Sequence, residues 1–258
     1  MSAHPYLTLI KFRNHVTFVN VLFGAFLFAQ EPDWRLVAEL AALYLSFNVL
    51  MYGGIYTLND LADLEADRMH SAKRLRPIAS GAVDPRAAWR FGILMILAGL
   101  VTAVPLFPMG IVACYLAVLA VNAAYSLGGR NIRYVDIVLN SVPHVIRFLM
   151  GVLLVDRRPP ATHLVTLLLF ACAMSFLRRS VEREHPGWAA RQTLHGYGRQ
   201  ELRIGAWLCC SALFVMAGFF ARDAPGFYVA VIVSALVLIV GGHYVALVRK
   251  PLAVIWTR

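Results

Sequence analysis

The sequence predicts an all-α, polytopic membrane helix bundle. Of its 258 residues, 60% are hydrophobic and only 15% are charged. The hydrophobic residues come in repeated blocks close to the roughly 20 residues that an α-helix needs to cross a bilayer. Lys and Arg concentrate in alternate connections between these blocks. No separate soluble domain fits between the blocks, so we expect residues 1–258 to form a single transmembrane domain.

Eight blocks are long enough to predict membrane spans. The N-terminal segment lacks the layout of a cleaved signal peptide, so we expect the first span to remain in the mature protein. In chain order, the predicted spans cover residues 15–30, 36–57, 87–104, 106–127, 135–155, 162–178, 203–221 and 226–248.

The net charge of +10 does not indicate a nucleic-acid partner, because of where the charges lie. Bases collect at both ends of the chain and in the connections after spans two, four and six. By the positive-inside rule these segments face the cytoplasm, which agrees with an even number of spans. We therefore expect a multi-pass protein of a prokaryotic inner membrane whose basic side contacts anionic lipids. The opposite connections hold only Arg35, Arg157, Arg158 and Arg222.

The connection after the second span, NDLADLEADRMHSAKRLRPIASG, is rich in acids. Asp60, Asp63 and Asp67 are spaced i, i+3, i+7, so they share one face if the span continues as a helix, and Asn59 lies close by. Like charges at this spacing repel unless a cation neutralises them. Carboxylate oxygens suit Mg²⁺, which commonly bridges protein acids to phosphate oxygens. The three acids are therefore candidate Mg²⁺ ligands.

Three bases follow these acids, namely Lys73, Arg74 and Arg76. Residues 77–81, from Pro77 to Gly81, predict an extended or turned backbone. Acids for a metal beside bases for phosphate oxygens are what a leaving diphosphate requires. The alternative is a solvated helix end whose acids pair with the neighbouring bases.

The fifth span carries an ionisable stripe of Asp136, Asn140, His144 and Arg147, at separations of four, four and three. Such groups inside a membrane usually face the bundle interior, where they are candidates for substrate binding. At 1.5 Å per residue, Arg147 would lie roughly 16 Å deeper than Asp136, too deep for a topology signal. The alternative is a structural ladder that pairs with Asn122 or with other spans.

A second charged segment follows the sixth span, where Arg178 and Arg179 precede Glu182. Separations of four and three allow either arginine to orient the glutamate on a helix. A cationic site of this kind suits a substrate that is itself a phosphate. Two arginines at the end of a span are also ordinary cytoplasmic anchors, and this alternative stays open.

The first charged segment resembles the first Asp-rich motif of the UbiA prenyltransferase superfamily. The resemblance implies a helical membrane bundle, usually of nine spans, with an isoprenoid chain in a central cavity and with Mg²⁺ and diphosphate in a cytoplasmic cap. The chain stops at Arg258 after eight predicted spans, so the last helix is expected to be missing or one long span to be divided differently. The resemblance is carried by Asn59, Asp60, Asp63, Asp67, Arg76, Pro77 and Gly81, with Tyr125 and Ser126 where the family has a Tyr-Ser pair.

Within the superfamily, the pattern resembles the decaprenyl-phosphate phosphoribosyltransferase branch most. That resemblance implies phosphoribosyl diphosphate as donor and a polyprenyl phosphate as acceptor. Ser71 and the N-terminal KFRNHVTFVN depart from the branch, which usually has Pro at the first position and Trp and Lys-Asn in the second segment. The matching residues are Glu65, Asp67, Arg68, His70, Lys73, Arg74, Arg178, Arg179, Glu182, Arg191 and Tyr197.

We therefore expect a Mg²⁺-dependent transferase that acts on a diphosphate-bearing donor and an isoprenoid lipid. Asp60, Asp63 and Asp67 would hold the metal, and Lys73 and Arg76 would stabilise the leaving group. The expected substrate-binding residues are Asn59, Arg74, Tyr125, Asp136, Asn140, His144, Arg147, Arg178, Arg179 and Glu182.

Three other interpretations remain open at this stage. The nearest is prenyl transfer from a polyprenyl diphosphate to an aromatic acceptor, with Asp136, His144 or Glu182 helping to remove a ring proton. A transporter would use the intramembrane stripe as a pathway, but would not explain acids followed by bases and a turn. An inactive family member is the third.

Overall fold

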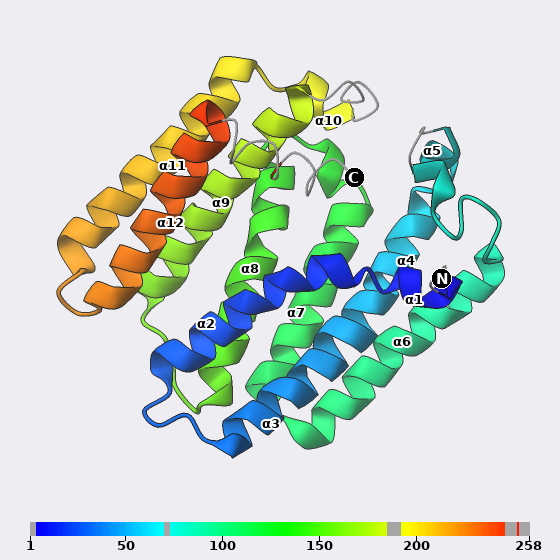
Figure 1. The fold of residues 1–258 in the computed structure, drawn as a ribbon, viewed down its shortest axis with the longest axis horizontal. Helices are drawn as coiled ribbons and strands as arrows, with labels where there is room; N and C mark the ends of the chain where they lie inside the picture. The colour runs from blue at the N-terminus through cyan, green and yellow to red at the C-terminus, as the bar shows by residue number, and fades with distance from the viewer. Residues whose placement is uncertain (1–3, 70–72, 185–191, 246–251, 253–258) are drawn as a thin grey trace. The chain divides into compact units, whose positions relative to one another are not determined.

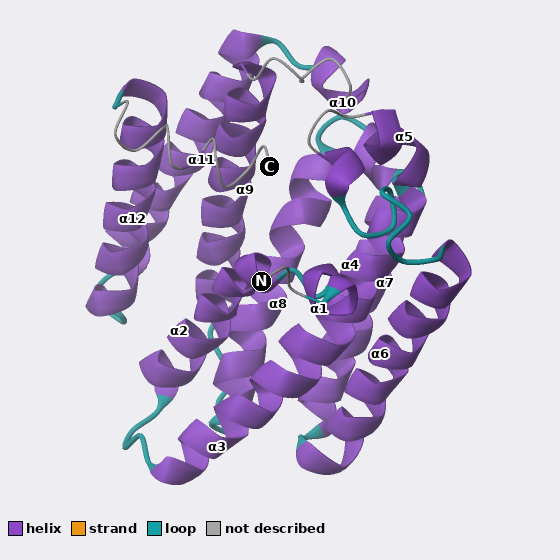
Figure 2. Ribbon diagram, turned by 45° about the vertical axis from the view of Figure 1, so that its right-hand side comes forward, coloured by secondary structure: helices purple, strands orange, loops and turns teal. Residues whose placement is uncertain are grey.

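The computed structural model describes residues 4–69, 73–184, 192–245 and 252, and within them it contains helices and loops but no strand (Figure 2). Seven of the described helical segments are long and apolar enough to cross a membrane. The chain divides into two compact units. Unit 1 comprises Met1–Asn122 and Ile146–Arg158, and unit 2 comprises Ala123–Val145 and Pro159–Arg258.

Unit 1 holds the first half of the chain, and its helices are labelled in Figure 1. Two of the long helices, α7 and α8, have residues in both units. The elements are α1 (Pro5–Leu9), η1 (Phe12–Phe18), α2 (Val19–Phe28), α3 (Trp34–Leu43), η2 (Tyr44–Met51), α4 (Tyr52–Ala62), α5 (Leu64–Met69), η3 (Lys73–Leu75), α6 (Pro85–Leu106), α7 (Met109–Ser126) and α8 (Val135–Leu154).

Local capping explains where the long helices of unit 1 begin. Asp33 accepts a hydrogen bond from the backbone N–H of Leu36 at the start of α3. Asp84 does the same for Ala87 at the start of α6, where Pro85 occupies the first turn. From α3 the chain stays helical through the π-helical segment η2 and α4, giving one 29-residue segment.

Small residues let two neighbouring helices of unit 1 approach closely. A Cβ atom added at Gly99 of α6 would lie 2.7 Å from the backbone oxygen of Ser46 and 2.9 Å from the backbone nitrogen of Met51. Contacts this close are typical of membrane helices that pack through glycine. The apolar core of this unit includes the buried side chains of Phe47, Met51 and Tyr115.

Unit 2 holds the second half of the chain. Its helices α11 and α12 pack against α9 and against each other (Figure 1). Pro225 occupies the first turn of α12, and the Glu201 carboxylate accepts a hydrogen bond from the Gly198 N–H at the start of α11. The elements beyond those already bounded are η4 (Gly129–Asn131), α9 (Ala161–Glu184), α10 (Gln192–His195), α11 (Arg199–Phe220) and α12 (Pro225–Tyr244).

The prediction of an all-α membrane protein is confirmed, and seven of the eight predicted spans coincide with candidate spans. The first predicted span, residues 15–30, is not confirmed as one. The structure gives a 3-10 segment, η1, followed by α2, which has 10 residues. At 1.5 Å per residue α2 covers about 15 Å, and the seven residues of η1 add about 14 Å at 2.0 Å per residue. Together they approach the roughly 30 Å of a bilayer core, so this span stays a prediction. The single domain remains a prediction.

Candidate functional site

The acidic motif brings two buried carboxylates together through one arginine. Asp60 lies near the end of α4 and Asp67 lies in α5, and their side chains are 4% and 3% exposed. Arg76 Nη1 lies 2.9 Å from Asp60 Oδ1 and 2.7 Å from Asp67 Oδ2. Two acids and a base that the sequence predicted to act together therefore meet in the structure.

A short turn positions Arg76 beside the acids. Ile78 is 1% exposed and packs in a small apolar cluster with Leu9, Val83 and Ala88. The backbone N–H of Val83 donates to the carbonyl oxygen of Pro77, which closes the turn. Gly81 has a φ of +81°, a conformation that glycine adopts readily. The predicted turned backbone over residues 77–81 is thus confirmed.

Asp63 departs from the expected arrangement. Helix α4 ends at Ala62, Asp63 has φ −95° and ψ 5°, and α5 begins at Leu64. The three acids therefore do not lie on one uninterrupted helix. Asp60 and Asp67 are buried, whereas Asp63 is half-buried.

Lys11, one of the bases near the N-terminus, joins this cluster. Its Nζ lies 2.6 Å from Asp60 Oδ1, the oxygen that Arg76 also contacts. Burial lowers the pKa of Lys11, and the neighbouring Asp60 carboxylate opposes that shift. The two residues are 49 positions apart, so no local spacing could have indicated the contact.

The remaining predicted residues of this segment surround the cluster. Burial raises the pKa of Asp67, and the positive charges of Arg76 and Lys73 oppose that rise. Lys73 and Asn59 are half-buried and Arg74 is exposed. His70 and Ser71 lie outside the described residues.

Two carboxylates of the acidic motif are placed where they could serve Mg²⁺. No group of three or more His, Cys, Asp or Glu side chains that could hold a metal is found in the described residues. Two carboxylates, Asp60 and Asp67, do converge on one point. Mg²⁺ is usually bound by one or two carboxylates and completes its coordination with water and substrate phosphates. The pair therefore fits a metal that arrives with a diphosphate.

In unit 2, Arg179 is the centre of a buried ionic network. Its Nε lies 2.7 Å from Asp136 Oδ2 and its Nη1 lies 2.8 Å from Glu182 Oε2. The hydroxyl of Tyr197 donates to Asp136 Oδ1 over 2.5 Å and accepts from the backbone N–H of Tyr134. Burial and this bond to Asp136 raise the pKa of Tyr197, so its hydroxyl stays a donor.

The network gives the two predicted arginines different roles. Arg179 is fully buried, and only its Nη2 lacks a hydrogen-bond partner in the described part of the chain. Arg178 pairs with Glu182 over 2.8 Å, and its side chain is 35% exposed. Arg178 is thus the more accessible of the two. Arg191 lies outside the described residues.

Other predicted residues of unit 2 lie around this network. Asn140 donates to the Ser175 hydroxyl on α9 over 2.9 Å, and Ser141 also contacts that hydroxyl. Tyr125 is close enough to interact electrostatically with Arg179. His144 is half-buried on α8. Asn140 therefore has a structural partner within the unit.

In unit 1, Arg147 lies against aromatic rings. Its guanidinium carbon is 4.3 Å from the ring centroid of Tyr52 and 5.8 Å from that of Phe47, and the residue is 3% exposed. The side-chain nitrogen of Asn122, the residue named in the alternative of a structural ladder, lies 3.5 Å from the Tyr52 hydroxyl. A buried arginine over aromatic faces gains cation–π stabilisation.

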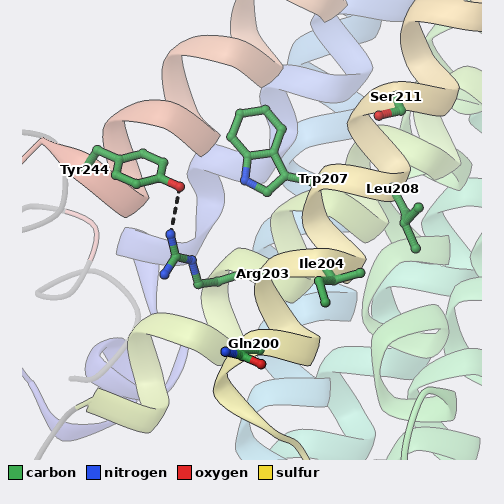
Figure 3. Close-up of a pocket in the computed structure, with 7 residues that line it drawn as sticks. All are labelled: Gln200, Arg203, Ile204, Trp207, Leu208, Ser211 and Tyr244. Carbon is green, nitrogen blue, oxygen red and sulfur yellow. Dashed lines mark hydrogen bonds between the residues drawn. The ribbon is translucent and has the colours of Figure 1, made fainter.

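A groove of about 420 Å³ on α11 and α12 contains none of the residues assigned from the sequence (Figure 3). Arg203 lies at one end and donates to the Tyr244 hydroxyl over 2.7 Å. Trp207, Ile204 and Leu208 supply apolar lining.

Known proteins from two mycobacteria are similar in sequence to 75% of this chain. The chain is 31% identical over 199 residues to a decaprenyl-phosphate phosphoribosyltransferase of Mycolicibacterium smegmatis, a match that covers 75% of this chain and 62% of that protein. A protein of the same name from Mycobacterium tuberculosis is 28% identical, with 75% and 64% covered. The chain therefore spans less than two thirds of the length of these relatives.

The fold is also that of a solved structure. A UbiA homolog from Archaeoglobus fulgidus, bound to GPP and Mg²⁺, superposes with a TM-score of 0.81 at 16% identity, and the alignment covers 98% of this chain and 95% of that one. The family model for the UbiA prenyltransferase family matches residues 17–253. The chain belongs to the UbiA prenyltransferase family.

Proposed function

We propose that this chain is a membrane-embedded, Mg²⁺-dependent transferase that acts on a diphosphate-bearing donor and an isoprenoid lipid. The observation that supports it most is the junction of Asp60, Arg76 and Asp67, where two buried carboxylates share one guanidinium nitrogen. Such a junction offers oxygens to a metal and N–H groups to a phosphate within one small volume. Membership of the family supports the same assignment.

The favoured reaction is phosphoribosyl transfer from phosphoribosyl diphosphate to a polyprenyl phosphate. Its first support is the likeness to relatives named decaprenyl-phosphate phosphoribosyltransferase. Its second is the chemistry of the second charged segment, where Arg178 and Arg179 stand beside a single glutamate. Cations at that segment suit an anionic acceptor better than a neutral ring.

On this proposal, Asp60 and Asp67 hold Mg²⁺, with Asp63 as a third candidate ligand. When bound, the metal supplies positive charge that neutralises the donor diphosphate. Arg76 donates to diphosphate oxygens from those N–H groups of its guanidinium that do not face the acids. Lys73 and Arg74 bind further oxygens, and Asn59 assists, so that positive charge is already in place where the leaving group gains negative charge.

The reaction needs no nucleophile from the protein. An oxygen of the acceptor phosphate forms a bond to the anomeric carbon of the ribosyl group. The bond from that carbon to the diphosphate breaks, and its electron pair leaves with the diphosphate. Because the attacking oxygen is already an anion, no proton has to be removed.

The acceptor phosphate would be held chiefly by Arg178. Two of the Arg179 nitrogens, Nε and Nη1, are engaged by Asp136 and Glu182, so only Nη2 remains for a ligand. Asp136 and Glu182 therefore act by positioning Arg179. Tyr125, Asn140, His144 and Arg147 are assigned to substrate binding.

The second candidate is prenyl transfer from a polyprenyl diphosphate to an aromatic acceptor. It is favoured by the A. fulgidus homolog, which is bound to GPP and Mg²⁺. In this version a side chain must accept a ring proton. The candidates are Asp136, His144 and Glu182. Arg179 and Tyr197 engage Asp136, and Arg178 and Arg179 engage Glu182, so either carboxylate would have to give up a partner to accept a proton.

Labelled donors separate the two reactions. Membranes containing the protein are incubated with Mg²⁺ and either labelled phosphoribosyl diphosphate with a polyprenyl phosphate, or a labelled prenyl diphosphate with 4-hydroxybenzoate. We expect labelled lipid only in the first incubation. Label transferred to the aromatic acid, with none from the phosphoribosyl donor, would reject the favoured reaction and support the second.

The metal assignment has its own test. The variants Asp60→Asn and Asp63→Asn should lose Mg²⁺-dependent transfer, because an amide is a poorer ligand for Mg²⁺ than a carboxylate. Full turnover in the combined variant would refute the metal site. We also propose that the acidic motif and both termini face the cytoplasm of a prokaryotic inner membrane, which thiol labelling of single cysteines placed there would check.

A further inference from the structure

Lys11 reaches the acidic motif from a constrained backbone. It lies between α1 and η1 and has a φ of +55°, in the left-handed region that residues with a Cβ seldom adopt. Its neighbours Leu9 and Ile10 are 0% and 6% exposed, so packing holds the segment in place. The side chain passes over the ring of Tyr56, with Nζ 5.6 Å from the centroid.

One oxygen of Asp60 receives two cations. Lys11 Nζ lies 2.6 Å and Arg76 Nη1 lies 2.9 Å from Asp60 Oδ1. Arg76 also reaches Asp67, whereas Lys11 forms its ion pair with Asp60. The Asp60 oxygen is thus the point at which a lysine and a divalent cation would meet.

A divalent metal ion that joined the two cations already at this oxygen would be strongly repelled, because the separations are short and the Asp60 carboxylate is buried. A metal at Asp60 therefore displaces the Lys11 ammonium. The displaced group carries three N–H donors in a half-buried setting, where it is costly to leave them without acceptors. The oxygens of a diphosphate bound to the same metal would supply these acceptors.

We infer that Lys11 is a counter-ion exchanged by the substrate: it neutralises Asp60 in the free protein and transfers its ammonium to the donor diphosphate when the metal takes Asp60. This rests on the proposed function, because it requires a diphosphate at the acidic motif. Its consequence is that the metal and the diphosphate bind as a pair. Metal alone must displace Lys11 without offering it an acceptor, so it binds weakly.

The coupling can be measured without turnover. The full chain is purified in detergent, and free Mn²⁺ is followed by electron paramagnetic resonance with and without inorganic pyrophosphate. Without pyrophosphate, Lys11→Met should bind Mn²⁺ about tenfold more tightly than the unmodified protein, a typical coupling between two sites. With Mn²⁺ present, the same variant should bind pyrophosphate about tenfold more weakly.

Two further variants make the result specific. Lys11→Arg keeps the cation and should resemble the unmodified protein in Mn²⁺ binding without pyrophosphate. Arg13→Met removes one positive charge from an exposed residue two positions away and should change neither affinity. Thermal unfolding of each variant checks that the fold persists, and Lys11→Gln, which also removes the charge, carries the test with the same expectations if Lys11→Met does not fold.

The inference is overturned if Lys11→Met leaves the Mn²⁺ affinity unchanged, or shifts it equally with and without pyrophosphate, as a plain change of net charge would. These outcomes are distinct from a failure of the proposed function. If neither donor transferred its label but Lys11→Met still bound Mn²⁺ more tightly, the proposed reaction would be rejected. Lys11 would then remain a cation that competes with the metal. Active phosphoribosyl transfer with unchanged Mn²⁺ affinity would reject the role of Lys11 alone.

Discussion

Arg179 donates a hydrogen bond from Nε to Oδ2 of Asp136 over 2.7 Å, and the two side chains are 1% and 0% exposed. Removing one member of a buried ion pair leaves the other charge without compensation, which costs about 3–5 kcal/mol. We therefore expect Asp136→Asn and Arg179→Gln each to lower the free energy of unfolding by an amount in this range, measured by thermal or denaturant unfolding in detergent.

Arg178→Gln is the matched control, because Arg178 is one position away and pairs with Glu182 while partly exposed. An exposed pair is worth about 0–1 kcal/mol, so this variant should unfold close to the unmodified protein. Its transfer activity should nevertheless fall, because we assign it to the acceptor phosphate. If Arg179→Gln proved as mild as Arg178→Gln in unfolding, the buried network would not be the stabilising feature that its geometry indicates.

Arg76 is the residue whose loss should damage transfer most among the bases of the acidic motif. It holds Asp60 and Asp67 together from one nitrogen, and we assign its other N–H groups to the diphosphate. Arg76→Gln removes both functions, and we expect activity to fall about 100-fold, the usual effect of losing one preorganised charge stabiliser. Arg76→Lys should retain part of the activity, since an ammonium keeps the charge but not the planar fork.

Arg86→Gln controls for net charge in that experiment, because Arg86 is exposed in the first turn of α6. Its activity should stay within about twofold of the unmodified protein, as is usual for an exposed charge away from a site. Equal losses in the variants of Arg76 and Arg86 would show that overall charge, and not the junction with the acids, controls the rate.

Seven of the eight predicted spans coincide with long helices because each is a long apolar segment. The acidic motif could be predicted because Asp60, Asp67 and Arg76 lie within 17 consecutive residues. The Lys11–Asp60 contact could not be predicted, since 49 positions separate the two residues. The same holds for Arg179 and Asp136, which are 43 apart. The sequence shows that a buried charge needs a partner, but only the packing of helices selects which one.

One local miss has a physical cause. The predicted helix through the acids is broken at Asp63, because the backbone there leaves helical geometry before α5 begins. The span at residues 15–30 stays a prediction, because apolar composition does not distinguish a full crossing from a ten-residue helix after a 3-10 segment.

Substitutions of Tyr52 test whether the contact between its ring and the Arg147 guanidinium contributes to substrate binding. The ring of Tyr52 lies 4.3 Å from the guanidinium carbon, so Tyr52→Phe keeps the ring face and should be nearly neutral. Tyr52→Leu removes it and should cost on the order of 1–2 kcal/mol of unfolding free energy. If Arg147 lines the substrate site, Tyr52→Leu should also raise the KM for the lipid acceptor. An unchanged KM with lowered stability would leave Arg147 a purely structural residue.

Gly99 offers a test of the close helix approach in unit 1. A Cβ atom at this position would meet backbone atoms of the neighbouring helix, namely the Ser46 oxygen at 2.7 Å and the Met51 nitrogen at 2.9 Å. Backbone cannot move aside as the end of a side chain can, so Gly99→Ala should destabilise the protein by about 1–3 kcal/mol through overpacking. Thermal unfolding in detergent measures this loss.

Gly218 in α11 provides the matched control, since a Cβ atom added there meets nothing within 4 Å. Alanine is favoured over glycine inside a helix by up to about 1 kcal/mol, so Gly218→Ala should be neutral or slightly stabilising. The two variants make the same chemical change in two long helices, and they differ only in what the new methyl group meets. Opposite shifts in the unfolding temperature would therefore locate the effect in the contact of α6 with the Ser46–Met51 backbone, whereas two stabilising shifts would contradict that close approach.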